Sequence, residues 1–596
     1  MLQAQEYLSD LPDQPFENFL EFLNDKELNF AEKPAIYFRE GKQKDFTVWS
    51  FAKYSGVCKR VARGLLKAGF QKGDRVALWC ENRPEWMAIW MGAAIAGCII
   101  VPIDFLITDD EVVNILNLTR AKAFFYSQRK IKFIEGLAAK KITPDILIQV
   151  TGDDANGLTV ASERQFERFG LDAATQALPD SSSISGSDPV SVVFTSGTTG
   201  LSKGVTLSHD GIIKNAGAAV RILRPDAKDT FINVLPLHHT YPTSCSFITP
   251  FSIGVPTIIV EKLIGQVVIA DIHDAHGTFL IAVPILYDKV MTGINAKLNK
   301  IPQPVRGIIN IMRKKSLAEA KRGNPYWGRK ALRFIRKKAG LESIDTMVAG
   351  GGALSPSTAD FFDSLGFNIV HGYGMSENGP LVSVSTPWHK NNVSVGLPVK
   401  YTEVKIVDQD DDTKELAIGE VGEITVKSPS LMLGYYENPQ ATAEMFCANG
   451  FLKTGDLGFL DNDGFIYING RKKNLIVSSG GKNIYPEEIE TYFATSRIVL
   501  EILVLGRRGD QGEFIFAVVV PNMENLALDY PDTKLDNDFI KQRVKEEIEN
   551  VNRKLQSYKK ICDFTLRSEP FEKNAQQKIR RFMYKDYADP QKTPLD

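Results

Sequence analysis

The sequence has few cysteines and almost no net charge for its length. Its six cysteines are scattered over 596 residues without a C-x-x-C pair, which argues against a disulfide framework and a zinc site and suits a reducing compartment. The formal net charge of −1 gives no overall attraction to nucleic acid. The first ten residues hold no basic cluster or apolar run, so we expect no secretory signal and a cytoplasmic location.

Long apolar runs are also absent. Residues 87–103 are uncharged and mostly apolar, but they fall short of the roughly 20 residues that a membrane-spanning helix needs. Gly97 and Pro102 interrupt the stretch, which therefore predicts a buried helix followed by a buried strand.

Strand-like and helix-like segments alternate over most of the chain. A strand pattern at 75–80 follows a helix pattern at 51–69, and short alternating strands begin near residue 390. The length indicates two or more domains. We predict an α/β protein in which residues 1–471 form a large N-terminal domain of doubly wound sheets with a small β-barrel-like part. Residues 472–596 would form a small α+β C-terminal domain.

A phosphate-binding loop is predicted within residues 191–209, S-V-V-F-T-S-G-T-T-G-L-S-K-G-V-T-L-S-H. A strand pattern breaks into six consecutive hydroxyl or glycine residues, and Lys203 then opens a second apolar run. Free backbone N–H groups, hydroxyls and a lysine suit phosphates. The Walker pattern differs, because its lysine precedes Ser or Thr and opens a helix. An ordinary Ser/Thr/Gly hairpin turn is the alternative.

Two glycine-rich motifs follow predicted strands, where α/β sheets bind ligands. They are G-G-G-A-L at 350–354 and H-G-Y-G-M-S-E at 371–377. The glycines and Tyr373 offer flat surfaces to a nucleotide base, and Glu377 offers a carboxylate to a hard cation. Each motif alone also fits an ordinary turn.

Two further motifs lie in the last third of the chain. F-L-K-T-G-D-L-G ends at residue 458 and places Asp456 in a tight turn, where a carboxylate can accept both hydroxyls of a ribose; Arg471 can second it. E-K-N-A-Q-Q-K-I-R-R, which ends at residue 581, is basic and carries Lys578. A polar turn or a solvated charge run would explain either motif alone.

In this order the four motifs resemble those of the adenylate-forming enzymes, which include acyl-CoA synthetases, firefly-type luciferases and peptide-synthetase adenylation domains. The similarity covers nearly the whole chain. R-K-K-N-L-I-V-S-S-G-G-K-N-I-Y-P-E-E-I-E, P-L-H-H-T-Y and a basic insert before M-V-A-G-G-G-A-L most resemble long-chain fatty acid–CoA ligases. The resemblance implies that a fatty acid reacts with ATP and Mg²⁺ to give acyl-AMP and pyrophosphate. CoA then takes the acyl group and AMP leaves.

The resemblance also implies roles for individual residues. Ser376 would contact the α-phosphate, Glu377 would hold Mg²⁺, and His238 or His239 would lie near the acyl carboxylate. Lys578 would bridge that carboxylate and the α-phosphate in the first step. The residues implied to bind the phosphates, adenine and ribose are Thr195, Ser196, Gly197, Thr198, Thr199, Gly200, Lys203, Gly351, Gly352, Ala353, Gly372, Tyr373, Gly374, Ser376, Asp456 and Arg471.

Lys473 matches the hinge position of the family. The resemblance implies a mobile C-terminal domain that rotates between the two half-reactions, removing the Lys578 loop and bringing the 479–484 loop, with Gly480 and Gly481, to the thiol. Two residues depart from the family pattern. Ser376 stands where threonine is usual and keeps the hydroxyl. Gln577 stands where glycine commonly precedes the lysine, so we expect a stiffer loop.

One segment stands out by its charge. Residues 306–338 carry 12 Lys and Arg against a single acidic residue, Glu319, with apolar residues interleaved. This pattern fits a solvated helical face. It also fits a surface that meets anionic lipid headgroups at the inner face of a membrane.

Other functions stay open from the sequence. The same adenylation chemistry can serve a medium-chain or aryl acid, or a free acyl carrier protein as the acceptor. We expect residues 241–256 to line the acyl pocket, but they do not fix the length of the acyl chain. The oligomeric state also stays open. A nucleotide-binding scaffold without turnover is a further alternative. Lys203, Glu377, Asp456 and Lys578 argue against it because they retain the chemistry.

Overall fold

The computed structural model describes residues 16–588, apart from 42, 151–164, 196–201, 387, 478–481, 495, 510–511 and 574–578. The chain divides into two compact units. The second unit comprises 404–426, the residues from 447 onwards and the short piece 288–290, and the first unit comprises the rest. Within the described ranges, no helix is long and apolar enough to cross a membrane.

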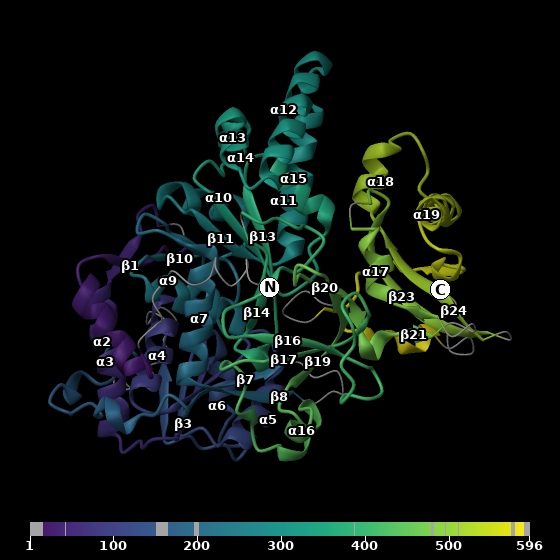
Figure 1. Cartoon of the computed structure of the whole chain (residues 1–596). Coiled ribbons are helices and arrows are strands. Elements are labelled where there is room, and N and C mark those ends of the chain that lie inside the picture. Colours follow the sequence, from purple (N-terminus) through teal and green to yellow (C-terminus); the bar gives the residue numbers. More distant parts are fainter. Residues whose placement is uncertain are drawn as a thin grey trace. The chain divides into compact units, whose positions relative to one another are not determined.

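The first unit contains a seven-stranded sheet with the order β18-β8-β7-β4-β3-β5-β6 (Figure 1). The five strands from β7 to β6 run parallel to one another. The β7–β8 and β8–β18 pairs are antiparallel. The strands are β3 Arg75–Trp79, β4 Ile99–Pro102, β5 Ala123–Tyr126, β6 Ile146–Gln149, β7 Pro189–Thr195, β8 Lys203–Ser208 and β18 Gly434–Tyr435.

A nine-stranded sheet forms the other half of this unit, with the order β15-β14-β13-β12-β11-β9-β10-β1-β2. The six strands from β13 to β1 are parallel, and the outer strands are antiparallel. The strands are β1 Pro34–Phe38, β2 Thr47–Ser50, β9 Phe231–Asn233, β10 Thr257–Ile259, β11 Phe279–Ala282, β12 Thr346–Ala349, β13 Asn368–Gly374, β14 Leu381–Val384 and β15 Leu397–Pro398.

Helices connect these parallel strands, as such sheets require, and the predicted α/β class is confirmed. In Figure 1, α12 stands out from the sheets of the first unit, with α13 and α14 near it. The helices are α2 Phe19–Phe30, α3 Phe51–Lys67, α4 Pro84–Ile95, α5 Asp109–Thr119, α6 Ile131–Glu135, α7 His209–Leu223, α8 Thr240–Pro242, α9 Thr249–Ser252, α10 Gly265–Asp274, α11 Pro284–Asn299, α12 Gln303–Lys321, α13 Tyr326–Ala331, α14 Arg333–Ala339, α15 Pro356–Ser364 and α16 Pro439–Met445.

Local sequence explains the elements around α4. Ser50 caps α3 by accepting a hydrogen bond from the backbone N–H of Lys53 at 3.2 Å. Pro84 lies in the first turn of α4, where its missing N–H costs nothing. Eleven of the twelve α4 residues are buried, so the uncharged stretch is a core helix that leads into the buried strand β4, as predicted.

The second unit has three small sheets and its own apolar core. A four-stranded sheet joins β16 Glu403–Val407, β17 Gly422–Lys427, β19 Leu452–Leu460 and β20 Ile466–Arg471. The α+β part that follows contains β21 Ile476–Val477, β22 Asn483–Ile484, α17 Pro486–Thr491, β23 Val499–Gly509, β24 Gly512–Pro521, α18 Met523–Asp529, α19 Asn537–Asn552 and β25 Asp563–Leu566. By its contacts the four-stranded sheet groups with this part, and the domain boundary after residue 471 stays a prediction.

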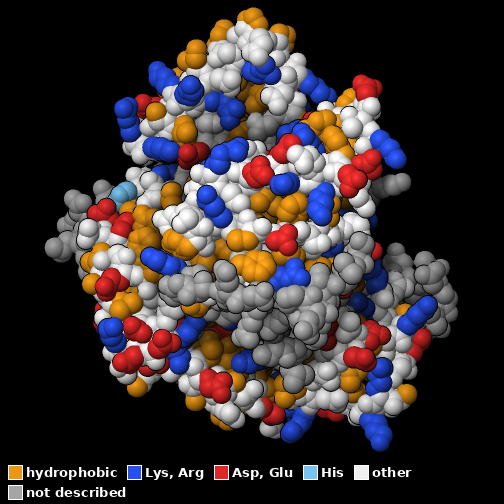
Figure 2. All heavy atoms as spheres, turned by 90° about the vertical axis from the view of Figure 1, so that its right-hand side faces the viewer, with side chains coloured by type: hydrophobic (Ala, Val, Ile, Leu, Met, Phe, Trp, Pro, Cys, Tyr) orange, Lys and Arg blue, Asp and Glu red, His pale blue; other side chains and the backbone are white. Residues whose placement is uncertain are grey.

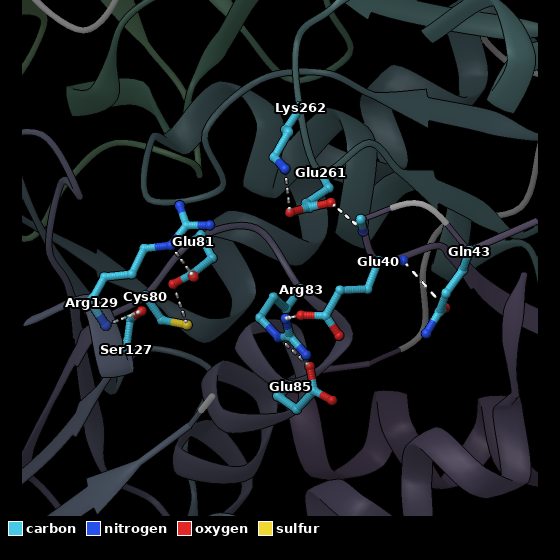
Figure 3. A network of polar contacts seen from close by, with 11 residues as sticks. Glu40, Gln43, Cys80, Glu81, Arg83, Glu85, Ser127, Arg129, Glu261 and Lys262 are labelled. Carbon is cyan, nitrogen blue, oxygen red and sulfur yellow. Dashed lines mark hydrogen bonds and ion pairs between the residues drawn. The ribbon is translucent and has the colours of Figure 1, made fainter. Parts of the chain in front are cut away.

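A polar network joins the two sheets of the first unit at the carboxyl ends of β3 and β1 (Figure 3). Arg83, after β3, donates to Glu40 Oε1 at 2.8 Å and to Glu85 Oε2 at 3.2 Å. Burial alone would lower the pKa of Arg83, but the two carboxylates outweigh it and raise the pKa. Beside them, Glu261 accepts from the Gly41 N–H at 2.7 Å. The network holds together the edge where α/β sheets bind ligands.

Candidate active site

The two strands of the predicted phosphate loop form an antiparallel hairpin. Thr195 ends β7 and pairs with Lys203, the first residue of β8. Thr195 Oγ1 also lies 3.4 Å from the Lys203 carbonyl oxygen, to which it donates. The prediction that Lys203 opens a strand rather than a helix is confirmed. The predicted binding residues Ser196, Gly197, Thr198, Thr199 and Gly200 lie outside the described residues.

Tyr435 links the lysine of this hairpin to the predicted metal-binding carboxylate. Its strand β18 pairs with β8, with Tyr435 opposite Val205. The Lys203 Nζ lies 4.8 Å from the centre of the Tyr435 ring, which is a cation–π distance. The Tyr435 hydroxyl donates to Glu377 Oε1 at 2.8 Å. A single aromatic side chain therefore fixes both charged groups.

The Tyr435 hydroxyl stays protonated in this arrangement. Burial raises its pKa above the ordinary value, and the charge and hydrogen bond of Glu377 raise it further. The hydroxyl is thus a permanent donor and Glu377 the acceptor. Sequence reasoning missed Tyr435, because the motifs give no signal for a contact that spans 58 residues.

Ser376 and Glu377 lie on a short 3-10 helix directly after β13, covering Ser376–Asn378. The carbonyl oxygen of Glu377 accepts from the Met432 N–H at 2.8 Å. The hydroxyls of Ser376 and Thr240 lie 3.2 Å apart. Because Thr240 directly follows His239, the segment implied to meet the acyl carboxylate touches the residue implied to meet the α-phosphate.

His238 and His239 form a compact cluster with Asp104. Their Nε2 atoms lie 3.2 Å apart, and His238 Nε2 lies 3.4 Å from Asp104 Oδ1. Burial would raise the pKa of Asp104, but its hydrogen bond with His238 and the charge of that ring lower the pKa to about 2. The donor atoms of the three side chains lie within 4.8 Å of one another, close enough for a metal ion. Sequence reasoning missed Asp104, which follows β4.

Asn82 fixes the loop that leads to the two histidines. Its side chain donates to the Leu235 carbonyl oxygen at 2.7 Å and accepts from the Leu237 N–H at 2.8 Å. Asn82 follows β3 of one sheet, whereas the loop follows β9 of the other. The histidine loop is therefore held against the opposite sheet.

The predicted adenine-binding residues lie at the carboxyl ends of two neighbouring parallel strands, β12 and β13. His371 Nε2 bonds the Gly352 carbonyl oxygen at 2.9 Å. Burial lowers the pKa of His371, and this bond only partly opposes the effect. The ring of Tyr241 lies under the loop, only 2.7 Å from where a Cβ on Gly350 would stand. Tyr373 is buried and Ala353 is exposed; the roles of Gly351, Gly352, Ala353, Gly372 and Tyr373 stay predictions.

Gly374 has a structural reason to be glycine. A Cβ on it would stand 2.1 Å from the Pro380 carbonyl oxygen. The Met375 N–H donates to that same oxygen at 2.9 Å, so Pro380 folds back over the residues that lead to Glu377. This close approach sets the course of the backbone into the site.

The second unit brings together the predicted ribose-binding pair. Asp456 on β19 is opposite Arg471 on β20, and Arg471 Nε lies 2.6 Å from Asp456 Oδ1. Asp456 is 4% exposed, so the arginine neutralises a nearly buried charge. Both residues were predicted to hold the ribose, and that role stays a prediction.

Lys473 lies in a short 3-10 helix, Lys472–Asn474, between β20 and β21. Burial lowers its pKa, and the charge of Arg471 lowers it further, against the opposing charge of Asp456. Neighbouring Lys472 is anchored on Glu423 at 2.8 Å. The remaining predicted residues of this unit, Gly480, Gly481 and Lys578, lie outside the described residues.

Most of the segment predicted to line the acyl pocket, residues 241–256, belongs to a largely buried helical run. It begins at α8 with Thr240, continues as a π-helix over Thr243–Ile248 and ends with α9 at Ser252. Every residue of the π-helix is buried. Among the described residues, the hydroxyls of Ser244, Ser246 and Thr249 find no hydrogen-bond partner, which leaves polar atoms in an otherwise apolar segment.

Comparisons with protein families match nearly the whole chain. The model described as AMP-binding enzyme matches residues 24–436. The model described as AMP-binding enzyme C-terminal domain matches residues 473–590.

The curated relatives have low sequence identity to this chain, but the matches cover most of its length. The putative acyl–CoA ligase YdaB of Bacillus subtilis (strain 168) is 28% identical over 465 residues, covering 76% of this chain and 80% of its own. A long-chain-fatty-acid–CoA ligase of Salmonella typhimurium is 28% identical over 534 residues, covering 85% of this chain and 86% of its own.

Solved structures share the fold. The anthranilate CoA ligase AuaEII, in complex with anthranoyl-AMP, has a TM-score of 0.77 at 21% identity and covers 98% of this chain and 99% of its own. O-succinylbenzoate coenzyme A synthetase (MenE) from Bacillus subtilis, in complex with ATP and a magnesium ion, has a TM-score of 0.70 at 21% identity. It covers 95% of this chain and 99% of its own.

Proposed function

Since the chain belongs to the AMP-binding enzyme family, and is an enzyme of the acyl-CoA ligase type, we propose that it joins a long-chain fatty acid to CoA. In the first half-reaction a carboxylate oxygen attacks the α-phosphorus of ATP, giving acyl-AMP and pyrophosphate. In the second, the CoA thiol attacks the acyl carbon, the thiol proton is lost and AMP leaves.

The chemistry explains why ATP is needed. A carboxylate is a poor acylating agent because hydroxide leaves badly, whereas AMP leaves readily. The first step brings an anion up to a polyanion, so cations and N–H donors around the phosphates should dominate the rate enhancement.

One observation carries the proposal: the contact between Thr240 and Ser376 at 3.2 Å. It unites a segment proposed to meet the acid with a residue proposed to meet the α-phosphate. The second part of the arrangement is Lys203 over Tyr435, whose hydroxyl bonds Glu377. Both parts belong to the first unit. Together they would form one site that binds both an acid and the triphosphate of ATP.

We assign the polar groups of this unit as follows. Lys203 and the Thr195–Gly200 loop hold the β- and γ-phosphates and stabilise the departing pyrophosphate. Ser376 donates to the α-phosphate, and His239 orients the acyl carboxylate with His238 behind it. Bound Mg²⁺ would neutralise phosphate charge, and Glu377 is fitted to hold it because a carboxylate is a ligand that Mg²⁺ prefers and one oxygen already has its donor in Tyr435.

The second unit would supply the mobile groups. We assign the ribose hydroxyls to Asp456, which Arg471 holds at 2.6 Å. Lys578 is the cation proposed to bridge the carboxylate and the α-phosphate, and Lys473 the hinge about which the domain rotates. The loop with Gly480 and Gly481 would receive CoA.

The long-chain acid is supported by two observations. Relatives that cover more than four fifths of this chain include a long-chain-fatty-acid–CoA ligase at 28% identity. The segment after the histidines, from Thr243 to Ile248, is wholly buried, which suits an alkyl chain better than a charged substrate. Medium-chain and aryl acids, and an acyl carrier protein as the acceptor, are the competing assignments.

A panel of acids tests the proposal. The purified protein is given ATP and Mg²⁺ with short-, medium- and long-chain fatty acids and with aryl acids, and acid-dependent ATP–pyrophosphate exchange is measured. We expect the largest exchange with long-chain acids, and a thioester once CoA is added. The Lys203→Gln variant is the matched control, because its exchange should fall with every acid.

Other outcomes would contradict specific parts. Preference for an aryl or medium-chain acid would overturn the substrate. Exchange without a CoA thioester, but with acylation of carrier protein, would overturn the acceptor. No exchange with any acid would favour a scaffold.

A further inference from the structure

The basic segment is not uniform in the structure. From Lys321 onwards, four of its eight cations have carboxylate partners on the same unit, and a fifth, Arg336, donates to backbone carbonyl oxygens. Lys321 pairs with Asp360 at 3.1 Å and Arg333 with Glu342 at 2.6 Å. Arg329 pairs with Asp345. These ion pairs tie α12, α13 and α14 to the rest of the unit. For these three residues, the interpretation as a solvated helical face is therefore sufficient.

The hairpin of α11 and α12 is different. Residues 289–318 carry seven Lys and Arg and no Asp or Glu. Within the described ranges, Lys297, Lys300 and Lys314 have no carboxylate at salt-bridge distance, and all three are exposed. Their charges are therefore available to an outside partner.

The helix α12 already has a buried face. Ile309 and Ala320 are buried on it. Ser316 donates to the Asp363 carbonyl oxygen at 3.1 Å, and Arg313 donates to the Ser364 hydroxyl at 3.0 Å. This face packs on α15, as the apolar face of an amphipathic surface helix does.

A second apolar row lies on another side of the same helix. Val305, Ile308 and Ile311 are three residues apart, which places them along one side. They are 50%, 60% and 69% exposed. Figure 2 shows hydrophobic side chains at the top of the molecule, where α12 reaches in Figure 1, with Lys and Arg side chains below them. Aliphatic side chains this exposed in a row are unusual for a surface that meets only water.

We propose that the exposed row Val305, Ile308 and Ile311, together with Lys297, Lys300 and Lys314, docks the protein on an anionic lipid bilayer. The aliphatic side chains would enter the boundary between headgroups and acyl chains, while the lysine stems reach the phosphates. The lysines match the negative charge of the headgroups, and the aliphatic side chains match the apolar acyl chains. The proposal does not rest on the identity of the acid.

A bilayer fits this surface better than an acidic protein does. The row lies on α12, a helix that extends away from the sheets of the first unit (Figure 1). Lipid needs no groove, because acyl chains close around an inserted side chain. Inorganic phosphate would satisfy the lysines alone and would leave the isoleucines exposed.

Co-sedimentation of the full chain with vesicles tests the proposal. Vesicles contain phosphatidylcholine with or without phosphatidylglycerol, at low and high salt. We expect binding only to anionic vesicles, weakened by salt. Each lysine near an anionic surface contributes roughly fivefold in affinity, so Lys297→Gln, Lys300→Gln and Lys314→Gln together should weaken binding roughly 100-fold. Ile308→Ser with Ile311→Ser should weaken it roughly tenfold.

Matched controls make the result decisive. Lys321→Gln with Arg333→Gln removes two charges that already have carboxylate partners. The loss of vesicle affinity in this control should be roughly tenfold smaller, or less, than the loss in the triple variant. All variants should keep the thermal unfolding midpoint and activity without vesicles, since none lies in the assigned active site. Equal binding by wild type and the triple variant would overturn the proposal. So would binding to neutral vesicles alone, or binding to an acidic protein and to no vesicle.

Discussion

The hydroxyl of Tyr435 donates a 2.8 Å hydrogen bond to Glu377 Oε1. The ring that carries it lies 4.8 Å from the Lys203 ammonium. One neutral side chain thus contacts both a cation and an anion of the candidate site.

Two substitutions of Tyr435 separate its hydrogen bond to Glu377 from its cation–π contact with Lys203. Tyr435→Phe keeps the ring under Lys203 and removes the donor to Glu377. Because a hydrogen bond to a charged group contributes roughly 1.5–3 kcal/mol, we expect acid-dependent ATP–pyrophosphate exchange to fall roughly 10- to 100-fold. Tyr435→Leu also removes the cation–π contact and should fall further. An unchanged rate for Tyr435→Phe would contradict the role assigned to the hydroxyl.

Asp104→Asn tests whether the carboxylate positions the histidines. The asparagine keeps the shape and removes the charge that faces His238 Nε2 at 3.4 Å. If His239 orients the acid, the KM for the acid should rise roughly tenfold while kcat changes less, and Asp104→Glu should restore part of the loss. A fall in kcat alone, with KM unchanged, would show that Asp104 does not act through acid binding.

Lys473→Pro addresses the proposed hinge. Proline fixes φ near −65°, and position 473 lies in the short helix between β20 and β21. We expect ATP–pyrophosphate exchange to stay largely intact while thioester formation stops. Lys472→Pro is a neighbouring control, and equal loss of both half-reactions in Lys473→Pro would refute the hinge assignment.

Lys578→Ala should give the opposite result. Removing the bridging cation abolishes adenylation, measured as exchange, whereas acyl-adenylate supplied from outside still reacts with CoA. Retained exchange activity would count against the role assigned to Lys578.

His209 makes stability depend on pH. It opens α7, is 1% exposed, and its Nδ1 accepts from the Phe19 N–H at 3.4 Å. Burial lowers its pKa from 6.5 to about 4. Between these values the unfolded chain binds the proton more tightly than the folded one, so stability falls as pH drops from 6.5 towards 4.

The expected loss between pH 7 and pH 5 is about 2 kcal/mol, measured as the shift in urea midpoints. His209→Gln should remove that difference. His273→Gln, at a side chain that is 82% exposed, should leave it unchanged. An unaltered pH dependence in His209→Gln would show that other groups cause it.

The α/β class and several individual elements were predictable because local patterns specify them. The core helix before β4 and the strand that Lys203 opens follow from apolar runs, glycines and proline. The motifs also identified Glu377 and Ser376 as candidates. Residue types and their spacing carry that much information.

Tyr435 and Asp104 were not predictable in this way. Tyr435 reaches Glu377 only because β18 pairs with β8, and nothing in either short strand fixes that register by itself. Asp104 meets His238 because the carboxyl ends of β4 and β9, in different sheets, face each other. The charge count of the basic segment likewise concealed which cations are paired, since pairing with Asp360 and Glu342 depends on how the helices pack.

The contact between Thr240 and Ser376 has a consequence for selectivity. If His239 and Ser376 have the roles proposed above, an acid that seats badly would displace Thr240, and the 3.2 Å contact would pass that displacement to Ser376. A wrong substrate would then be penalised when the α-phosphate must be aligned, after it has already bound. We therefore expect the enzyme to discriminate among acids mainly through the rate of adenylation, with dissociation constants that differ far less from one acid to the next.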